Sequence, residues 1–145
     1  MSHTATIKTL MLSDKHAITA AIAELKTKGV NCELLENAVP RAYYKDQKGM
    51  GAADMVIKLN DSKYDVGLYK TADGTYESRC DFWDGQIEKQ LGVVPGKDDS
   101  RDQAKLGKFY RSYAAHAASR AAIQKGYQVN RVDNKDGSIQ LTVTT

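Results

Sequence analysis

A tyrosine and a histidine three residues apart are the side chains best placed for acid–base chemistry. Tyr113 and His116 fall in a stretch with helical spacing, so they share one flank of a predicted helix. A histidine with a pKa near about 6.5 beside a tyrosine hydroxyl can exchange protons with a substrate. No Ser, Cys or carboxylate at a recognisable spacing completes a catalytic triad. The alternative interpretation is a partly buried histidine bonded to a neighbour, so we predict no catalytic residues and favour a protein without enzymatic activity.

An arginine and two further aromatic residues occur at the ends of predicted strands. Arg41 and Tyr43 follow Pro40 at i and i+2, so in a strand they share a face. Trp83 stands where the third strand of a predicted meander ends. Because Trp, Tyr and Arg are enriched at binding hot spots, we predict that Arg41, Tyr43 and Trp83 lie on one side and bind a protein partner. Tyr113 and His116 are weaker candidates for the same site, and Trp83 as a lid on the core is the alternative.

Basic side chains recur along the predicted long helix, several of them opposite its apolar stripe. They are Arg101, Lys105, Lys108, Arg111, Arg120 and Lys125. A solvated helix face is one interpretation, and a docking face for an acidic partner or RNA is the other. A further hypothesis is a pocket between sheet and helices, lined by Tyr113, His116 and Trp83, that binds a small ligand or substrate.

No sequence motif indicates a metal-binding or nucleotide-binding site. The acidic residues of the connector match no calcium loop; they are Asp81, Asp84, Asp98, Asp99 and Asp102. Lys48-Gly49-Met50-Gly51 precedes a strand, whereas a phosphate-binding loop opens a helix. His3 lies near the chain start and we interpret it as an exposed polar residue. We therefore predict no metal and no cofactor.

Composition indicates an ordinary globular domain. Hydrophobic residues make up 41% and charged residues 27% of 145 residues, so we predict a single domain over residues 1–145. A net charge of +3 is too small to indicate nucleic-acid binding by itself. Cys32 and Cys80 lie in predicted strands without a Cys-x-x-Cys motif, so we expect two buried thiols. No apolar segment approaches the roughly 20 residues of a membrane span.

The segment 53–85 predicts a three-stranded antiparallel meander. Apolar and polar residues alternate with period two, and Asx and Gly residues mark the turns. The residues expected to share the helix-covered face are Met55, Ile57, Tyr64, Val66, Leu68 and Phe82.

Helices and further strands surround the meander. We expect strands over residues 4–10 and 30–40, a short strand over 41–45, and a hairpin over 127–145. A helix begins after Ser13 or Asp14 and ends at Gly29, and a second runs from about Ser100 to Lys125. Leu106, Phe109, Tyr110, Tyr113, Ala117 and Ala121 form the apolar stripe of the second helix. The order of elements predicts an α+β fold with a mainly antiparallel sheet and two amphipathic helices packed on one face.

Short segments along nearly the whole chain resemble a family known from algal plastids, cyanobacteria and their phages. The matching segments, in order, are Met1-Ser2-His3, Thr6-Ile7-Lys8-Thr9, Glu36-Asn37-Ala38-Val39, Arg41, Ala53-Asp54-Met55-Val56-Ile57, Tyr64-Asp65-Val66-Gly67, Asp73-Gly74-Thr75-Tyr76-Glu77, Asp81-Phe82-Trp83, Tyr113-Ala114 and Asp136-Gly137-Ser138-Ile139. The family is the hypothetical chloroplast reading frame thirty-five family, a domain of unknown function. Its pattern has a Gly after the Arg, whereas Ala42 follows here, and the segment 85–105 also diverges.

The resemblance implies a photosynthetic setting and no known activity. With it, we expect a small soluble binding or assembly factor in the cytoplasm of a cyanobacterial or phage-infected cell, or in a plastid stroma. The ligand-binding or enzymatic domain with a pocket and the RNA-binding protein are the alternatives.

Overall fold

A five-stranded antiparallel sheet forms the body of the protein in a computed structural model, which describes residues 4–42, 51–93 and 105–145, without the side chains of residues 4–10 and 83. The strand order is β1–β5–β4–β3–β2, which places β1 and β2 at the two edges. Their bounds are β1 (Thr4–Leu12), β2 (Cys32–Ala38), β3 (Ala53–Leu59), β4 (Val66–Lys70) and β5 (Tyr76–Asp81). Together with the helices that pack on it, this sheet confirms the α+β class predicted from the order of elements.

The central meander has the register that its alternation predicts. Met55 lies opposite Leu68, and Ile57 lies opposite Val66, so the four side chains share one face. Tyr64 and Phe82 lie just outside the strands and still belong to the same buried cluster. The predicted shared face of the meander is therefore confirmed.

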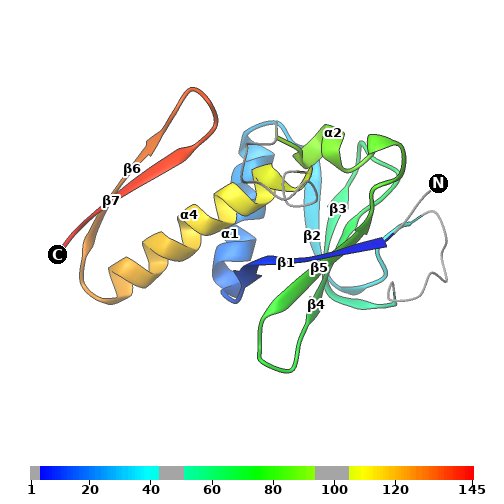
Figure 1. Ribbon diagram of the computed structural model, residues 1–145, viewed down its shortest axis with the longest axis horizontal. Helices are drawn as coiled ribbons and strands as arrows, with labels where there is room; N and C mark the ends of the chain where they lie inside the picture. Colours follow the sequence, from blue (N-terminus) through cyan, green and yellow to red (C-terminus); the bar gives the residue numbers. More distant parts are fainter. Residues whose placement is uncertain (1–3, 43–50, 94–104) are drawn as a thin grey trace.

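Two helices, α1 (Lys15–Thr27) and α4 (Gly107–Gln124), pack on that face of the sheet and on each other (Figure 1). Asp14 caps α1, and its side chain accepts a hydrogen bond of 3.1 Å from the backbone N–H of Ala17. Gly29 follows α1 with φ of +93°, the left-handed conformation expected at a helix C-terminus. The apolar stripe of α1, which is fully buried, consists of Ala17, Ile18, Ala21, Ile22 and Leu25.

The bounds and the apolar stripe of α4 differ from the prediction at both ends. The helix begins at Gly107, and the expected start near Ser100 lies outside the described residues. Ala121 is exposed, whereas Ala122 is buried. Residues chosen at a fixed spacing of seven move gradually around an α-helix, because the helix has about 3.6 residues per turn. The last turns of α4 also extend past the sheet (Figure 1), so the residue that is buried there shifts from Ala121 to Ala122.

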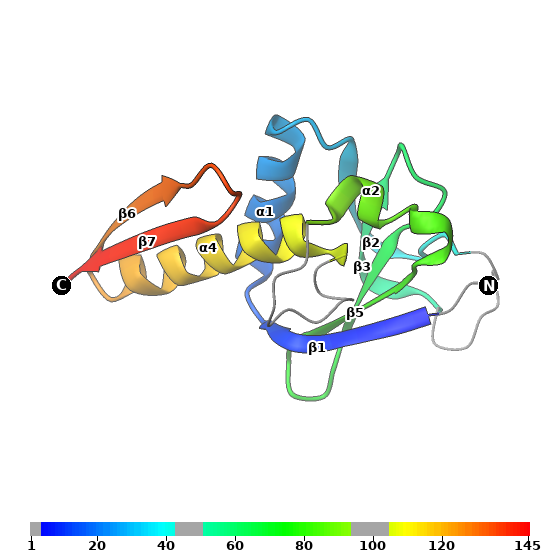
Figure 2. The same ribbon diagram turned by 45° about the horizontal axis from the view of Figure 1, so that its top comes forward.

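The C-terminal hairpin forms a separate two-stranded sheet. Its strands are β6 (Gln128–Asp133) and β7 (Ile139–Thr144), and both contact α4 (Figure 2). Gly137 occupies the turn with φ of +89°, as the Asp136-Gly137 signal predicts. Two short segments, η1 (Trp83–Gly85) and α2 (Glu88–Leu91), connect β5 to the region before α4.

The remaining predictions have mixed outcomes. Arg41 and Ala42 lie outside the strands, and the rest of the expected strand over residues 41–45 lies outside the described residues. Cys32 and Cys80 are buried thiols that form no disulfide, as expected. Over the described ranges, none of the helices combines the length and the apolar character required to cross a bilayer.

Candidate functional site

The carboxylate of Glu24 joins α1 to α4 and to the hairpin. Arg131 of β6 donates two hydrogen bonds to it, from Nη1 at 2.6 Å and from Nη2 at 3.1 Å. Ser112 Oγ donates at 3.0 Å, Lys28 Nζ at 3.2 Å, and His116 Nε2 lies 3.1 Å from Oε1. The hydrogen bonds from Arg131 lower the pKa of Glu24 to about 2 against the opposing effect of burial. Glu24 is therefore a carboxylate at neutral pH and ties three elements together.

The predicted acid–base pair, Tyr113 and His116, faces α1. His116 is bonded to Glu24, and the Tyr113 hydroxyl accepts hydrogen bonds from the backbone N–H groups of Ser13 at 2.9 Å and Asp14 at 3.1 Å. Tyr113 is only 3% exposed. These contacts agree with the alternative interpretation, a partly buried histidine bonded to a neighbour, and they give both side chains a role in packing α4 on α1.

Ser112, Glu24 and His116 are the residue types of a catalytic triad in a different order. In a triad the histidine lies between the hydroxyl and the carboxylate, where it can take the hydroxyl proton. Here the carboxylate lies between the other two, and Arg131 holds it with two hydrogen bonds. The only base that the hydroxyl contacts among the described residues is the Glu24 carboxylate, whose pKa of about 2 makes it a poor proton acceptor, so this arrangement is not that of an activated serine.

Arg41 is engaged within its own molecule. Its guanidinium donates to both carboxylate oxygens of Asp65, at 2.9 Å from Nε and 2.8 Å from Nη2, and to the carbonyl of Leu59 at 2.8 Å. Tyr43 lies outside the described residues, and the side chain of Trp83 is not described. The surface of Arg41, Tyr43 and Trp83 therefore stays a prediction. The hydrogen bonds of the Arg41 side chain run to Asp65, just before β4, and to Leu59 of β3, whereas those of Tyr113 and His116 run to α1 and the residues before it.

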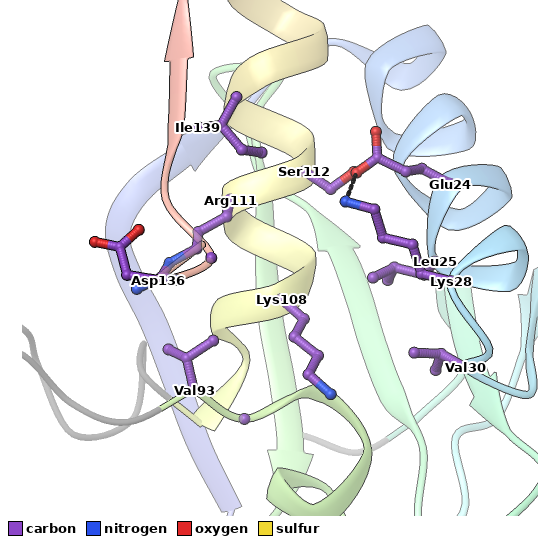
Figure 3. Close-up of a pocket in the computed structure, with 12 residues that line it drawn as sticks. Glu24, Leu25, Lys28, Val30, Val93, Lys108, Arg111, Ser112, Asp136 and Ile139 are labelled. Atoms are coloured by element: carbon purple, nitrogen blue, oxygen red, sulfur yellow. Dashed lines mark hydrogen bonds and ion pairs between the residues drawn. The ribbon is translucent and has the colours of Figure 1, made fainter. Parts of the chain in front are cut away.

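A cavity of about 480 Å³ opens beside the Glu24 contacts, between α1, the segment after α2, α4 and the β6–β7 turn (Figure 3). Its apolar lining comes from Leu25, Val30, Val93 and Ile139. Three cationic and two anionic side chains also line it; they are Lys28, Lys108 and Arg111, and Glu24 and Asp136. Neither Tyr113 nor His116 lines it, so it is not the pocket predicted from the sequence.

The three cations of the cavity differ in how they are paired. Lys28 forms ion pairs with Glu24 at 3.2 Å and with Asp133 at 3.3 Å. Lys108 and Arg111 form no ion pair within 4.0 Å in the part of the chain that the structure describes. The Lys108 ammonium extends toward the cavity from α4, and Arg111 reaches toward the hairpin turn (Figure 3). Lys108 therefore forms no ion pair with a described side chain, whereas the charge of Arg111 acts on Asp136 of the same cavity.

The hairpin turn is held close to Arg111. A Cβ on Gly137 would lie 2.8 Å from Nη1 of Arg111, so only glycine fits there without a shift of the guanidinium. Hydrogen bonds from Ser138 lower the pKa of Asp136, and the positive charge of Arg111 lowers it further. Across the described residues, His, Cys, Asp and Glu side chains nowhere gather in a group of three that could hold a metal ion.

Sequence reasoning placed Lys108 and Arg111 on a basic helix face and did not find the cavity. The basic residues of that face do not form one surface in the structure. Arg120 donates a hydrogen bond to Asp14 at 2.8 Å, and the Lys105 ammonium lies 4.7 Å from the ring centroid of Phe82. Arg101 lies outside the described residues. The available signal was the i, i+3 spacing of Lys108 and Arg111, but the opposing walls come from segments far apart in the chain.

Comparisons of the chain with protein-family models, with curated proteins and with solved structures find no match. The similarity to the hypothetical chloroplast reading frame thirty-five family thus stays a prediction from short segments.

Proposed function

We propose that this protein is a non-enzymatic binding protein whose ligand is a small organic anion with an apolar body. The observation that carries the proposal is the cavity in which the cations Lys108 and Arg111 lie beside an apolar wall, and in which Lys108 forms no ion pair with a described residue. Its volume of about 480 Å³ falls within the range of small-molecule sites, roughly 300–1,000 Å³.

The charge of the lining selects the head group of the ligand. Lys108 and Arg111 are three residues apart on α4; the Lys108 side chain extends toward Val30, and the Arg111 side chain extends toward Asp136 (Figure 3). A guanidinium holds a carboxylate or a phosphate with two parallel hydrogen bonds, and an ammonium adds a point charge. Glu24 and Asp136 do not oppose an anion with their full charge, because Arg131 is paired with Glu24 and the charge of Arg111 acts on Asp136.

The apolar side chains favour a ligand with a hydrocarbon portion. Leu25 and Val30 come from α1 and its end, whereas Val93 and Ile139 come from the opposite side of the cavity. Burial of apolar surface contributes roughly 25 cal/mol per Å². An anion with an apolar body therefore gains from both kinds of contact, whereas a bare anion or a neutral alcohol gains from only one.

The non-enzymatic assignment rests on the mutual contacts of Ser112, Glu24 and His116. Ser112, His116 and Glu24 are each hydrogen-bonded to another protein group next to the cavity. A photosynthetic setting, and a protein partner at Arg41, Tyr43 and Trp83, are proposals that rest on the sequence.

The proposal is tested by isothermal titration calorimetry with octanoate, which combines a carboxylate with an eight-carbon chain. Acetate supplies the charge without the apolar body, and 1-octanol supplies the apolar body without the charge. We expect octanoate to bind to one site, and acetate and 1-octanol to bind at least tenfold more weakly.

Substitutions then locate the binding. Lys108→Ala and Arg111→Ala each remove a charge-assisted contact worth about 1.5–3 kcal/mol, so each is expected to weaken octanoate binding tenfold or more. The matched control is Lys26→Ala, which removes the same charge from an exposed position of α1 outside the cavity. The proposal is wrong if octanoate does not bind, or if all three variants bind it as the wild type does.

A further inference from the structure

The hairpin leaves a strand edge without a partner among the described residues. The two-stranded sheet contains only β6 and β7, so each strand has one edge that no other described strand covers. At the turn, the N–H of Asn134 donates to the carbonyl of Ser138 at 2.9 Å. Asn134 and Ser138 are therefore a hydrogen-bonded pair, and such pairs alternate with non-bonded ones along an antiparallel ladder. Ile139, Leu141 and Val143 fall in the non-bonded pairs with β6, so their backbone N–H and C=O groups point to the outer edge of β7.

The two edges of the hairpin are not equivalent. β6 is tied to α1 by the ion pairs of Arg131 with Glu24 and of Asp133 with Lys28. β7 has the sequence IQLTVT, which contains no charged residue and no proline. Charges, prolines and bulges are the features that usually protect an edge strand from pairing with another chain. β7 has none of the charges or prolines that would do so.

The sequence of β7 is complementary to itself in antiparallel orientation. When two copies are centred on Leu141, this residue lies opposite its own counterpart and Ile139 lies opposite Val143. Gln140 then lies opposite Thr142, so apolar residues meet apolar ones on one face and polar residues meet polar ones on the other. The corresponding pairing of β6, centred on Arg131, would place two guanidinium groups opposite each other.

Exposed apolar side chains occur at the same end of the molecule. Val143 of β7 is 45% exposed, Ile123 in the last turn of α4 is 60% exposed, and Tyr127 just before β6 is 37% exposed. Figure 1 shows the hairpin and this end of α4 extending away from the five-stranded sheet. The three belong to the hairpin and to the end of α4 that precedes it.

We infer that a second copy of this chain pairs with β7 in antiparallel orientation, about a two-fold axis at Leu141. The two hairpins then form one four-stranded sheet, and the interface is made of the same residues on both subunits. Such a sheet is more stable than an isolated two-stranded hairpin, because backbone groups of the open edge gain partners. This inference is independent of the ligand proposed for the cavity.

The test uses charges on the outer face of β7, where Gln140 and Thr142 are exposed. Replacing both by lysine, in Gln140→Lys/Thr142→Lys, places like charges opposite each other across the two-fold axis. The matched variant Gln140→Lys/Thr142→Glu places opposite charges there. Sedimentation-velocity centrifugation is expected to show a dimer for the wild type, a dissociation constant at least tenfold higher for the double-lysine variant, and recovery in the lysine–glutamate variant.

Circular dichroism shows whether each variant is folded. If the double-lysine variant is unfolded, Val143→Pro replaces it, because it removes an N–H that points to the open edge. The inference is overturned if the wild type is a monomer at millimolar concentration. A dimer whose dissociation constant is the same in the wild type and in the folded edge variants would overturn it as well.

Discussion

Replacing Glu24 by glutamine is expected to destabilise the protein strongly, although the change conserves the shape of the side chain. The carboxylate is 15% exposed and accepts hydrogen bonds from Arg131, Ser112 and Lys28. Its pKa falls from 4.5 to about 2 in the folded protein. One pKa unit corresponds to about 1.4 kcal/mol, so the charged form contributes about 3 kcal/mol to the free energy of unfolding at pH 7.

The dependence on pH has a defined sign. Because folding lowers the pKa of Glu24, its contribution is fully present above pH 4.5 and is lost as the pH falls toward 2. The Glu24→Gln variant lacks this contribution at every pH. The difference in stability between wild type and variant should therefore be about 2–3 kcal/mol from pH 7 to pH 5 and should shrink below pH 4.5.

Urea denaturation followed by circular dichroism, at several values of pH between 7 and 3, measures this difference. The matched control is Glu36→Gln, because Glu36 forms an exposed ion pair with Lys15 at 2.7 Å. Such a surface pair contributes about 1 kcal/mol or less. The reasoning is refuted if Glu24→Gln costs no more than Glu36→Gln, or if its cost does not change between pH 5 and pH 3.

Three further experiments test the packing of the side chains. Gly107→Ala is expected to lower the free energy of unfolding, measured by urea titration, by about 1 kcal/mol or more, because the added Cβ would lie 2.3 Å from Cγ2 of Val93. Helix propensity alone predicts a gain in stability for this change, and such a gain would contradict the close approach of the two residues. Tyr113→Phe removes the hydroxyl that accepts two backbone N–H groups at the start of α1 and should cost about 1–3 kcal/mol by the same measurement, and a loss below about 0.5 kcal/mol would count against it. The two buried thiols should react with a bulky disulfide reagent only when urea unfolds the protein, and rapid reaction of the native protein would show that one of them is accessible.

The five-stranded sheet was largely predictable because its signal is local. Alternation at Met55 and Ile57 specifies which face is buried, and the Asx and Gly turns specify the register of the meander. The caps of α1, Asp14 and Gly29, are also local signals. Each of these features depends on residues a few positions apart, and so the sequence alone indicates them.

The polar contacts and the cavity were not predictable in the same way. Glu24 and Arg131 are 107 residues apart, and neither belongs to a periodic pattern. The walls of the cavity come together only when the hairpin packs against α4, which places Ile139 across from Val30. Sequence reasoning could identify Lys108 as a basic residue of a helix, but it could not show that the helix turns this side chain toward an apolar wall.

Binding of an organic anion with an apolar body between α1, α4 and the hairpin turn can be measured directly. The measurement is a titration of ¹⁵N-labelled protein with octanoate, followed by two-dimensional NMR. We expect saturable shifts of the backbone amides of Gly92, Val93, Gly137 and Ile139, which line the cavity. The amide of Tyr69 on β4, which does not line the cavity, should not move. Saturable shifts that instead cluster outside the cavity, or no shifts at millimolar octanoate, would contradict the proposed binding.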